Sequence, residues 1–197
     1  MLNVLFDAQA KAIAGHGGEI LKFIGDGLLA IFPIEHPGVA GVAARNALAA
    51  AMQAVEAARG LTSDPSLVGE PPLEIVVALH IGTAIYGNIG AADRLDFTVI
   101  GPAVNLVSRI EAVAKTLNLP IVVSTDFARA YGQQLHPLGR HELRWLATPH
   151  DLFAPILPSV RVWGSRAEYS ARCVSTQLNC SALSCSPNKT ATAMVAR

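Results

Sequence analysis

The sequence predicts an α+β fold, with an antiparallel-rich sheet and helices on one face of it. Two observations lead to this prediction. Short apolar runs occur in pairs around glycine-containing turns, as in residues 20–24 and 28–32, and this pattern is typical of β-hairpins. Longer stretches with helical spacing, such as residues 39–59 and 102–117, stand between the pairs. Hairpins interleaved with helices in this way favour a sheet covered by helices.

The first half of the chain is expected to contain two helices and one hairpin. Residues 2–16 have apolar positions on one side, and the two glycines that follow end this helix. Residues 20–32 form the hairpin, with Gly25-Asp26-Gly27 as its turn. The alanine-rich residues 39–59 form the second helix. Residues 61–72 hold three prolines and are expected to be a loop.

The second half begins with an apolar strand. Residues 73–81 are apolar on both faces, which predicts a central position in the sheet. Residues 84–89 and 95–100 form a second hairpin, and Pro102 suits the first turn of a helix that runs to about residue 117. The remaining expected elements are a strand at 120–123, a helix at 126–131 capped by Ser124 or Thr125, and three short strands near 134–138, 141–146 and 152–154.

A change in composition near residue 156 divides the chain in two. Residues 1–156 hold 14 acidic and 10 basic residues, whereas residues 157–197 hold one acidic and five basic residues. All three cysteines (Cys173, Cys180 and Cys185) lie in the second segment, so the first needs neither a disulfide nor a thiolate metal site. The second segment is rich in serine and has no clear periodicity. We expect residues 157–197 to be a disordered tail that contributes nothing to the core.

Composition also excludes several kinds of partner. The formal net charge is zero, which argues against a nucleic acid polymer or an acidic membrane surface as the main ligand. The chain does not start with a basic segment followed by an apolar one, as a signal peptide does. No uncharged apolar run is long enough to span a bilayer. The expected compartment is therefore the cytoplasm.

The first candidate site is the hairpin turn at Asp26. A carboxylate at a hairpin tip is exposed, and hard divalent cations prefer oxygen ligands, so Asp26 could bind a metal. Lys22 lies four residues earlier, and an even spacing on a strand would place both side chains on one face. The ordinary alternative is that Asp26 is a turn former and Lys22 a solvated lysine, and these residues alone favour that alternative.

The second candidate site is the helix that follows Gly101-Pro102. Asn105 and Arg109 are four positions apart, so they share one face of this helix. An amide and a guanidinium at this spacing could hold a ribose and a phosphate. The alternative is a polar face that pairs with solvent or with Glu111.

Together, the two blocks resemble the catalytic domain of class III adenylate and guanylate cyclases. The resemblance covers most of residues 1–155 and rests on residues 18–32 and 96–111, with support from His80-Ile81-Gly82 and from Gly87-Asn88-Ile89-Gly90. It implies a ferredoxin-like nucleotidyl cyclase fold. It also implies an adenylate cyclase, a lyase that makes cyclic AMP from ATP in intracellular signal transduction.

The resemblance assigns roles residue by residue. Lys22 and Thr98 fall on the family's base-recognising positions, and a threonine there resembles the subclass that includes bicarbonate-responsive enzymes. Asp26 falls on a metal-binding position. Asn105 and Arg109 fall on the pair that acts in the transition state. Arg144 falls where the family often has a basic residue near the triphosphate, but the glycine that usually adjoins it is Trp145 here.

Cofactors and partners are implied in the same way. The family uses two Mg²⁺ or Mn²⁺ ions per site, at the interface of a head-to-tail homodimer with shared active sites. One subunit would supply Lys22, Asp26 and Thr98, and the other would supply Asn105 and Arg109.

The chain departs from the family at its start. The family begins with a strand that carries a second metal-binding aspartate, and Asp7 lies too close to Asp26 to occupy that position. We therefore expect the first strand to be missing, a gap or unpaired edge in the sheet, and weak or no activity. Two alternatives stay open: a catalytically dead cyclase-like module that dimerises or regulates, and a diguanylate cyclase, which His16-Gly17-Gly18-Glu19-Ile20 only echoes.

Overall fold

The computed structural model describes residues 2–62, 74–91, 94–146, 148–156 and 190–196. Within this part of the chain, helices and a largely antiparallel sheet form the α+β architecture that the sequence predicts. The helices are α1 (Leu2–Gly15), α2 (Ala40–Thr62), α3 (Pro102–Leu117) and α4 (Thr125–Tyr131), with the 3-10 turn η1 (Pro37–Val39) before α2.

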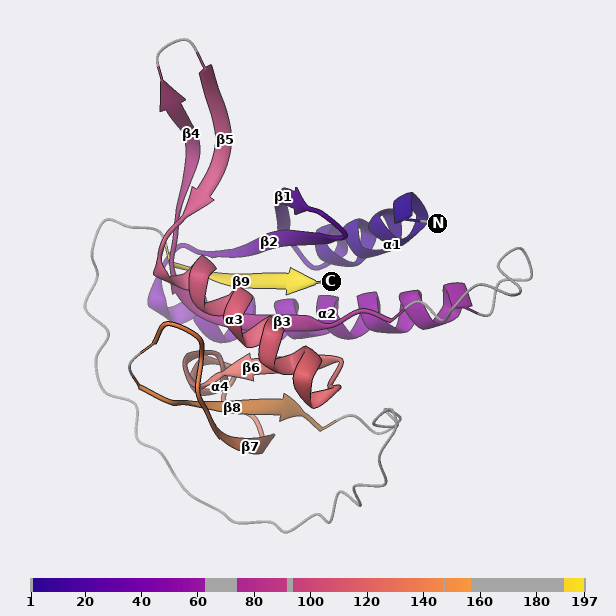
Figure 1. Ribbon diagram of the computed structural model, residues 1–197, viewed down its shortest axis with the longest axis vertical. Coiled ribbons are helices and arrows are strands. Elements are labelled where there is room, and N and C mark those ends of the chain that lie inside the picture. Colours follow the sequence, from indigo (N-terminus) through magenta and orange to yellow (C-terminus); the bar gives the residue numbers. More distant parts are fainter. Residues whose placement is uncertain (1, 63–73, 92–93, 147, 157–189, 197) are drawn as a thin grey trace.

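The main sheet has the strand order β1-β2-β9-β3-β6-β8-β7. Neighbouring strands are antiparallel except β3 and β6, which are parallel. The strands β4 and β5 form a separate hairpin, which projects away from the rest of the molecule (Figure 1). The strand bounds are β1 Glu19–Ile24, β2 Gly27–Ile34, β3 Val77–Thr83, β4 Ile85–Ala91, β5 Arg94–Ile100, β6 Ile121–Ser124, β7 Leu135–His141, β8 His150–Pro155 and β9 Thr190–Ala196.

Helices cover both faces of the main sheet, which corrects the expectation of helices on one face. Along β3, Val77 and Leu79 are buried in one cluster with residues of α1, α2 and α4, whereas Ala78 between them is buried in a second cluster with residues of α3. Successive side chains of a strand point to opposite faces, so the two clusters lie on opposite sides of the sheet. A strand that is apolar on both faces needs cover on both.

The expectation that the tail adds nothing to the core is wrong for residues 190–196. These residues form β9, which lies between β2 and β3 and pairs with both along its whole length (Figure 1). The side chain of Met194 is fully buried. The sequence predicted a gap or an unpaired edge in the sheet. Because β9 pairs with both neighbours, the described sheet has no gap between β2 and β3. Residues 157–189 lie outside the described part of the chain.

Most other expected elements are present, with shifted ends. The strand expected at 73–81 runs from Val77 to Thr83, and the expected loop at 61–72 falls mainly on residues that the structure does not describe. Three short strands were expected after residue 134, but the structure has two in this region, β7 and β8. Residues 142–146 form no strand. No helix in the described part of the chain is both long and apolar enough to cross a membrane.

Candidate functional site

The hairpin of β1 and β2 places Asp26 at its tip, as predicted. Ile24 pairs with Gly27, so Gly25 and Asp26 form a two-residue turn. Gly25 has φ 62°, a left-handed conformation that glycine adopts without the steric cost of a side chain. The side chains of Asp26 and Lys22 are both exposed. The first half of the candidate site is therefore a lysine and a carboxylate on one exposed hairpin.

Strand β5 carries Thr98 and contacts β1. Thr98 lies opposite Gly87 in the β4–β5 pairing. The backbone thus brings the strand of Thr98 next to the strand of Lys22. The side chain of Thr98 lies outside the described part of the structure.

The second half of the candidate site is the outer face of α3. Residues buried at helical spacing hold one side of α3 against the sheet, among them Ala103, Val107 and Ile110. Asn105 is exposed and Arg109 is half-buried. Glu111 is buried, and its carboxylate forms an ion pair of 2.8 Å with Lys115. The sequence left open that the polar face of this helix pairs with Glu111. The ion pair with Lys115 gives Glu111 a partner other than Arg109.

The start of α3 is fixed by close packing at Gly101. This residue has φ 141°, and a Cβ atom there would lie 3.0 Å from the carbonyl oxygen of Thr83. The backbone N–H of Asn105 donates a 3.3 Å hydrogen bond to the backbone carbonyl of Gly101, and this bond closes the first turn of α3. Pro102 follows, at a position where its missing N–H costs nothing. The end of β3 therefore determines where Asn105 and Arg109 stand.

Arg144 comes from a third part of the chain. It lies in the loop between β7 and β8 and is exposed, with its guanidinium 5.3 Å from the ring centre of Trp145. Trp145 is 80% exposed and has φ 66°. A non-glycine residue in this conformation is uncommon, and the tryptophan stands where the resemblance has a glycine. Its neighbour Leu143 is buried in one cluster with Val107 and Ile110 of α3, so this loop lies on the α3 side of the sheet.

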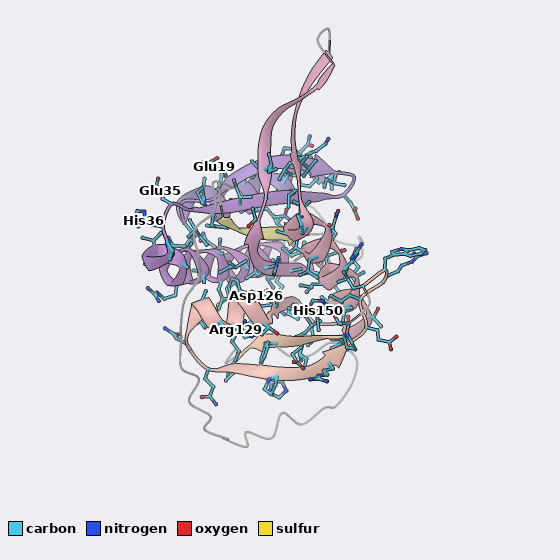
Figure 2. All side chains as sticks on the ribbon, turned by 90° about the vertical axis from the view of Figure 1, so that its left-hand side faces the viewer. Glu19, Glu35, His36, Asp126, Arg129 and His150 are labelled. Atoms are coloured by element: carbon cyan, nitrogen blue, oxygen red, sulfur yellow. The ribbon has the colours of Figure 1, made fainter. Side chains whose placement is uncertain are left out.

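A buried polar pair lies between β3 and the start of α4. The sequence predicted Ser124 as a candidate helix cap, which the structure confirms, but not its contact with His80. His80 Nδ1 is 2.8 Å from Ser124 Oγ, and Ser124 Oγ also accepts a 3.2 Å hydrogen bond from the amide of Phe127. Burial lowers the pKa of His80 to about 4; the charge of Asp126 raises it and that of His150 lowers it further. Asp126 and His150 are labelled in Figure 2. His80 is a neutral structural residue at neutral pH.

The donor atoms for a divalent cation are few. Asp26 is an exposed carboxylate, and Mg²⁺ is usually held by one or two carboxylates together with phosphate oxygens of a substrate. Asp26 therefore fits one cation held jointly with a nucleotide. No group of three His, Cys, Asp or Glu side chains that could hold a metal is present among the described residues.

A family profile described as the adenylate and guanylate cyclase catalytic domain matches residues 1–144, and the chain belongs to this family. Domains of this family generally use divalent metal ions. The matched range contains every candidate residue discussed above, from Lys22 to Arg144.

Two curated relatives are adenylate cyclases. Adenylate cyclase 1 of Rhizobium meliloti is 29% identical over 157 residues, which are 78% of this chain and 23% of the relative. The adenylate cyclase of Anabaena cylindrica is 33% identical over 132 residues, which are 65% of this chain and 25% of the relative. The chain thus spans about a quarter of the length of these relatives.

Solved structures of cyclases share the fold. The guanylyl cyclase Cya2 is 29% identical, with a TM-score of 0.64, over 77% of this chain and 76% of that one. The adenylyl cyclase CyaB from P. aeruginosa also has a TM-score of 0.64, at 24% identity, over 83% of each chain. Structures of both adenylyl and guanylyl cyclases are therefore similar to this chain, which confirms the predicted nucleotidyl cyclase fold.

Proposed function

We propose that this domain converts ATP to 3′,5′-cyclic AMP and pyrophosphate, at sites shared between two copies of the chain. The observation that carries the proposal is the family match over residues 1–144, combined with the exposure of Asp26 and Asn105 on separate elements. In the reaction, the ribose 3′-oxygen bonds to the α-phosphorus while the bond to the pyrophosphate oxygen breaks. The 3′-hydroxyl proton is lost.

The β1–β2 hairpin would select the base and hold the phosphates. The Lys22 ammonium can donate to N1 of adenine, and the Thr98 hydroxyl can donate to or accept from the adjacent edge, whereas guanine presents the opposite pattern there. The contact between β1 and β5 supports a joint role for these two residues. Asp26 would hold Mg²⁺ or Mn²⁺ with the triphosphate; a bound cation lowers the pKa of the 3′-hydroxyl and stabilises the leaving pyrophosphate.

The outer face of α3 would act on the reacting centre. Arg109 would place a guanidinium against the charge that develops on the phosphoryl oxygens, and Asn105 would orient the ribose. Their spacing of four residues puts them on one helix face, so both can reach the same nucleotide. We assign Arg144 only a supporting role near the triphosphate, since Trp145 replaces the small residue expected beside it.

Exposed apolar side chains border both surfaces and support a shared site. Phe23, beside Lys22, is 52% exposed and packs on Phe6 with ring centres 4.8 Å apart. Ile100, at the end of β5 just before α3, is 49% exposed. Exposed apolar residues mark an interaction site where they form a contiguous patch, and a second copy packed on both surfaces would bury these two side chains. A second copy in head-to-tail orientation would cover them and bring the hairpin of one copy to α3 of the other.

We expect the activity of this chain to be weak. Two cations in register need more than one protein carboxylate, and Asp26 is the carboxylate that the hairpin tip offers. Misplacement of reacting groups by about 1 Å can cost on the order of a hundredfold in rate. The alternative function is a cyclase-like module that dimerises but has no turnover. The scarcity of metal-ligating groups among the residues that the structure describes favours this alternative.

The test is formation of cyclic AMP from radiolabelled ATP by the purified full-length chain with Mn²⁺. We expect a slow rate that Asp26→Asn lowers further. Glu35→Gln is the matched control, because Glu35 is an exposed acid just beyond the other end of β2 (Figure 2). No turnover by a folded dimer would support the regulatory alternative. Rapid turnover would contradict the expected weakness and require a second carboxylate ligand.

A further inference from the structure

Strand β9 is held entirely by residues that are distant in the sequence. It pairs antiparallel with β2, from Leu28 opposite Ala196 to Ile34 opposite Thr190, and with β3, from Val77 opposite Ala196 to Thr83 opposite Thr190. Residues 156–189 separate it from β8. The slot between β2 and β3 is therefore formed without any residue adjacent to β9 in the chain.

The sequence of β9 has smaller residues than that of the neighbouring strand β2. β9 reads Thr-Ala-Thr-Ala-Met-Val-Ala, whereas β2 reads Gly-Leu-Leu-Ala-Ile-Phe-Pro-Ile and is buried at all but one position. The side chain of Met194 is fully buried. Met194 lies opposite Ala30 on one side and Leu79 on the other, and both of these are fully buried. Backbone hydrogen bonds to two strands supply much of the remaining stabilisation, as in peptides that add a strand to a sheet.

We propose that the slot between β2 and β3 is a strand-acceptor site that also binds Thr190–Ala196 of a second copy of the chain. Every backbone and side-chain contact that holds the resident strand is available to the same strand of another copy. The tether of residues 156–189 favours the resident strand, because an intramolecular strand has an effective concentration on the order of millimolar. Exchange therefore needs a high concentration of donor or a weakened resident strand.

The partner is defined by the chemistry of the slot. The seven residues of β9 carry no charge, and Ala30 and Leu79, which flank Met194, lie in the apolar core. A charged side chain at position 194 would be buried without a partner, which is costly. The site thus selects an uncharged antiparallel strand with a methionine-sized anchor at its fifth position. This inference concerns assembly and does not depend on the proposed nucleotide chemistry.

The first arm of the test uses full-length Met194→Ala and a synthetic peptide with the sequence of residues 188–197. The variant is expected to melt roughly 10 °C below the wild type, because a buried large-to-small change leaves a cavity. It should also lower the equilibrium constant for binding of the resident strand in its slot by roughly a hundredfold. The peptide should then restore the melting temperature at or below about millimolar concentration. The control peptide carries Met194→Asp and should restore nothing.

The second arm supplies the strand from a second copy. Tagged full-length Met194→Ala is refolded with full-length Leu79→Asp, whose own slot is damaged but whose β9 is intact. Capture of the mixed dimer is expected, and its loss is expected when the donor carries both Leu79→Asp and Met194→Asp. The proposal is overturned if Met194→Ala melts like the wild type, if both peptides act alike, or if both donors are captured equally.

Discussion

The tip of the β1–β2 hairpin and the outer face of α3 carry the two halves of the candidate site. The tip carries Asp26 and Lys22 in exposed positions, whereas α3 carries an exposed amide and a half-buried guanidinium. The hairpin contacts β9, β5 and α1, and α3 packs against β3, β6 and β9. The proposed cation-binding and phosphate-stabilising groups thus come from separate elements that share only β9 among these neighbours. This difference favours a site completed by a second copy.

The largest expected effect is on the α3 half. Arg109→Ala should lower cyclic AMP formation by about 10²–10³, because a donor aimed at transition-state charge is worth that much. The matched control is Arg129→Ala, on the exposed side of α4 (Figure 2), where the arginine pairs with Asp126 at 3.5 Å. Equal rates for the two variants, measured at saturating ATP, would remove Arg109 from the reacting centre.

The buried histidine of β3, His80, should contribute to acid stability. The pKa of His80 is about 4 when folded and about 6.5 when unfolded, so the unfolded state binds its proton first as the pH falls. The stabilisation is complete above pH 6.5 and is lost between pH 6.5 and 4, to a total on the order of 3 kcal/mol. Urea unfolding of His80→Gln should show a flatter pH dependence in this window. An unchanged slope would show that His80 is not the titrating group.

On the hairpin half, Lys22→Glu should change the choice of nucleotide. Replacing the donor to adenine N1 by an acceptor should cut turnover of ATP by about 10- to 100-fold relative to GTP. The measurement is the ratio of kcat/KM for the two nucleotides, with Lys11→Glu as an exposed control on α1. If the ratio stays constant while both rates fall, Lys22 has a role other than base selection.

The smallest effect is expected where β3 meets the start of α3. Gly101→Ala forces a side chain into φ 141° and against the Thr83 carbonyl, which should destabilise the domain by about 1–3 kcal/mol. Thermal unfolding measures this loss, and Gly60→Ala near the end of α2, where no atom lies within 4 Å of the added carbon, is the control. Similar melting temperatures would mean that α3 can begin without this glycine.

Strands β2 and β9 show what the sequence could predict about the fold. β2 is apolar along its length and follows a Gly-Asp-Gly turn, so its own residues indicate a strand. β9 is a run of small residues, and the strands beside it, β2 and β3, determine its place. Local pattern carries no information about such a distant partner. Local pattern also gives no information about which face of the sheet a helix covers. The sequence therefore predicted α3 but wrongly placed all helices on one face.

The candidate site divides in the same way. Asp26 at the hairpin tip follows from two adjacent apolar runs, and the shared face of Asn105 and Arg109 follows from their spacing. The pair of His80 and Ser124 joins residues 44 positions apart, so no local pattern points to it. The local sign is a histidine within an otherwise apolar strand. A polar side chain that is buried there needs a hydrogen-bond partner.

The most direct test of a site shared between two copies is a mixing experiment. Asp26→Asn and Arg109→Ala chains are assayed separately for cyclic AMP formation, and then after equal amounts are unfolded and refolded together. In a symmetric dimer, half of the dimers are mixed and each has one of its two sites intact, so about a quarter of the wild-type rate should return. No gain above the separate variants would contradict the account, because both halves would then act within one chain.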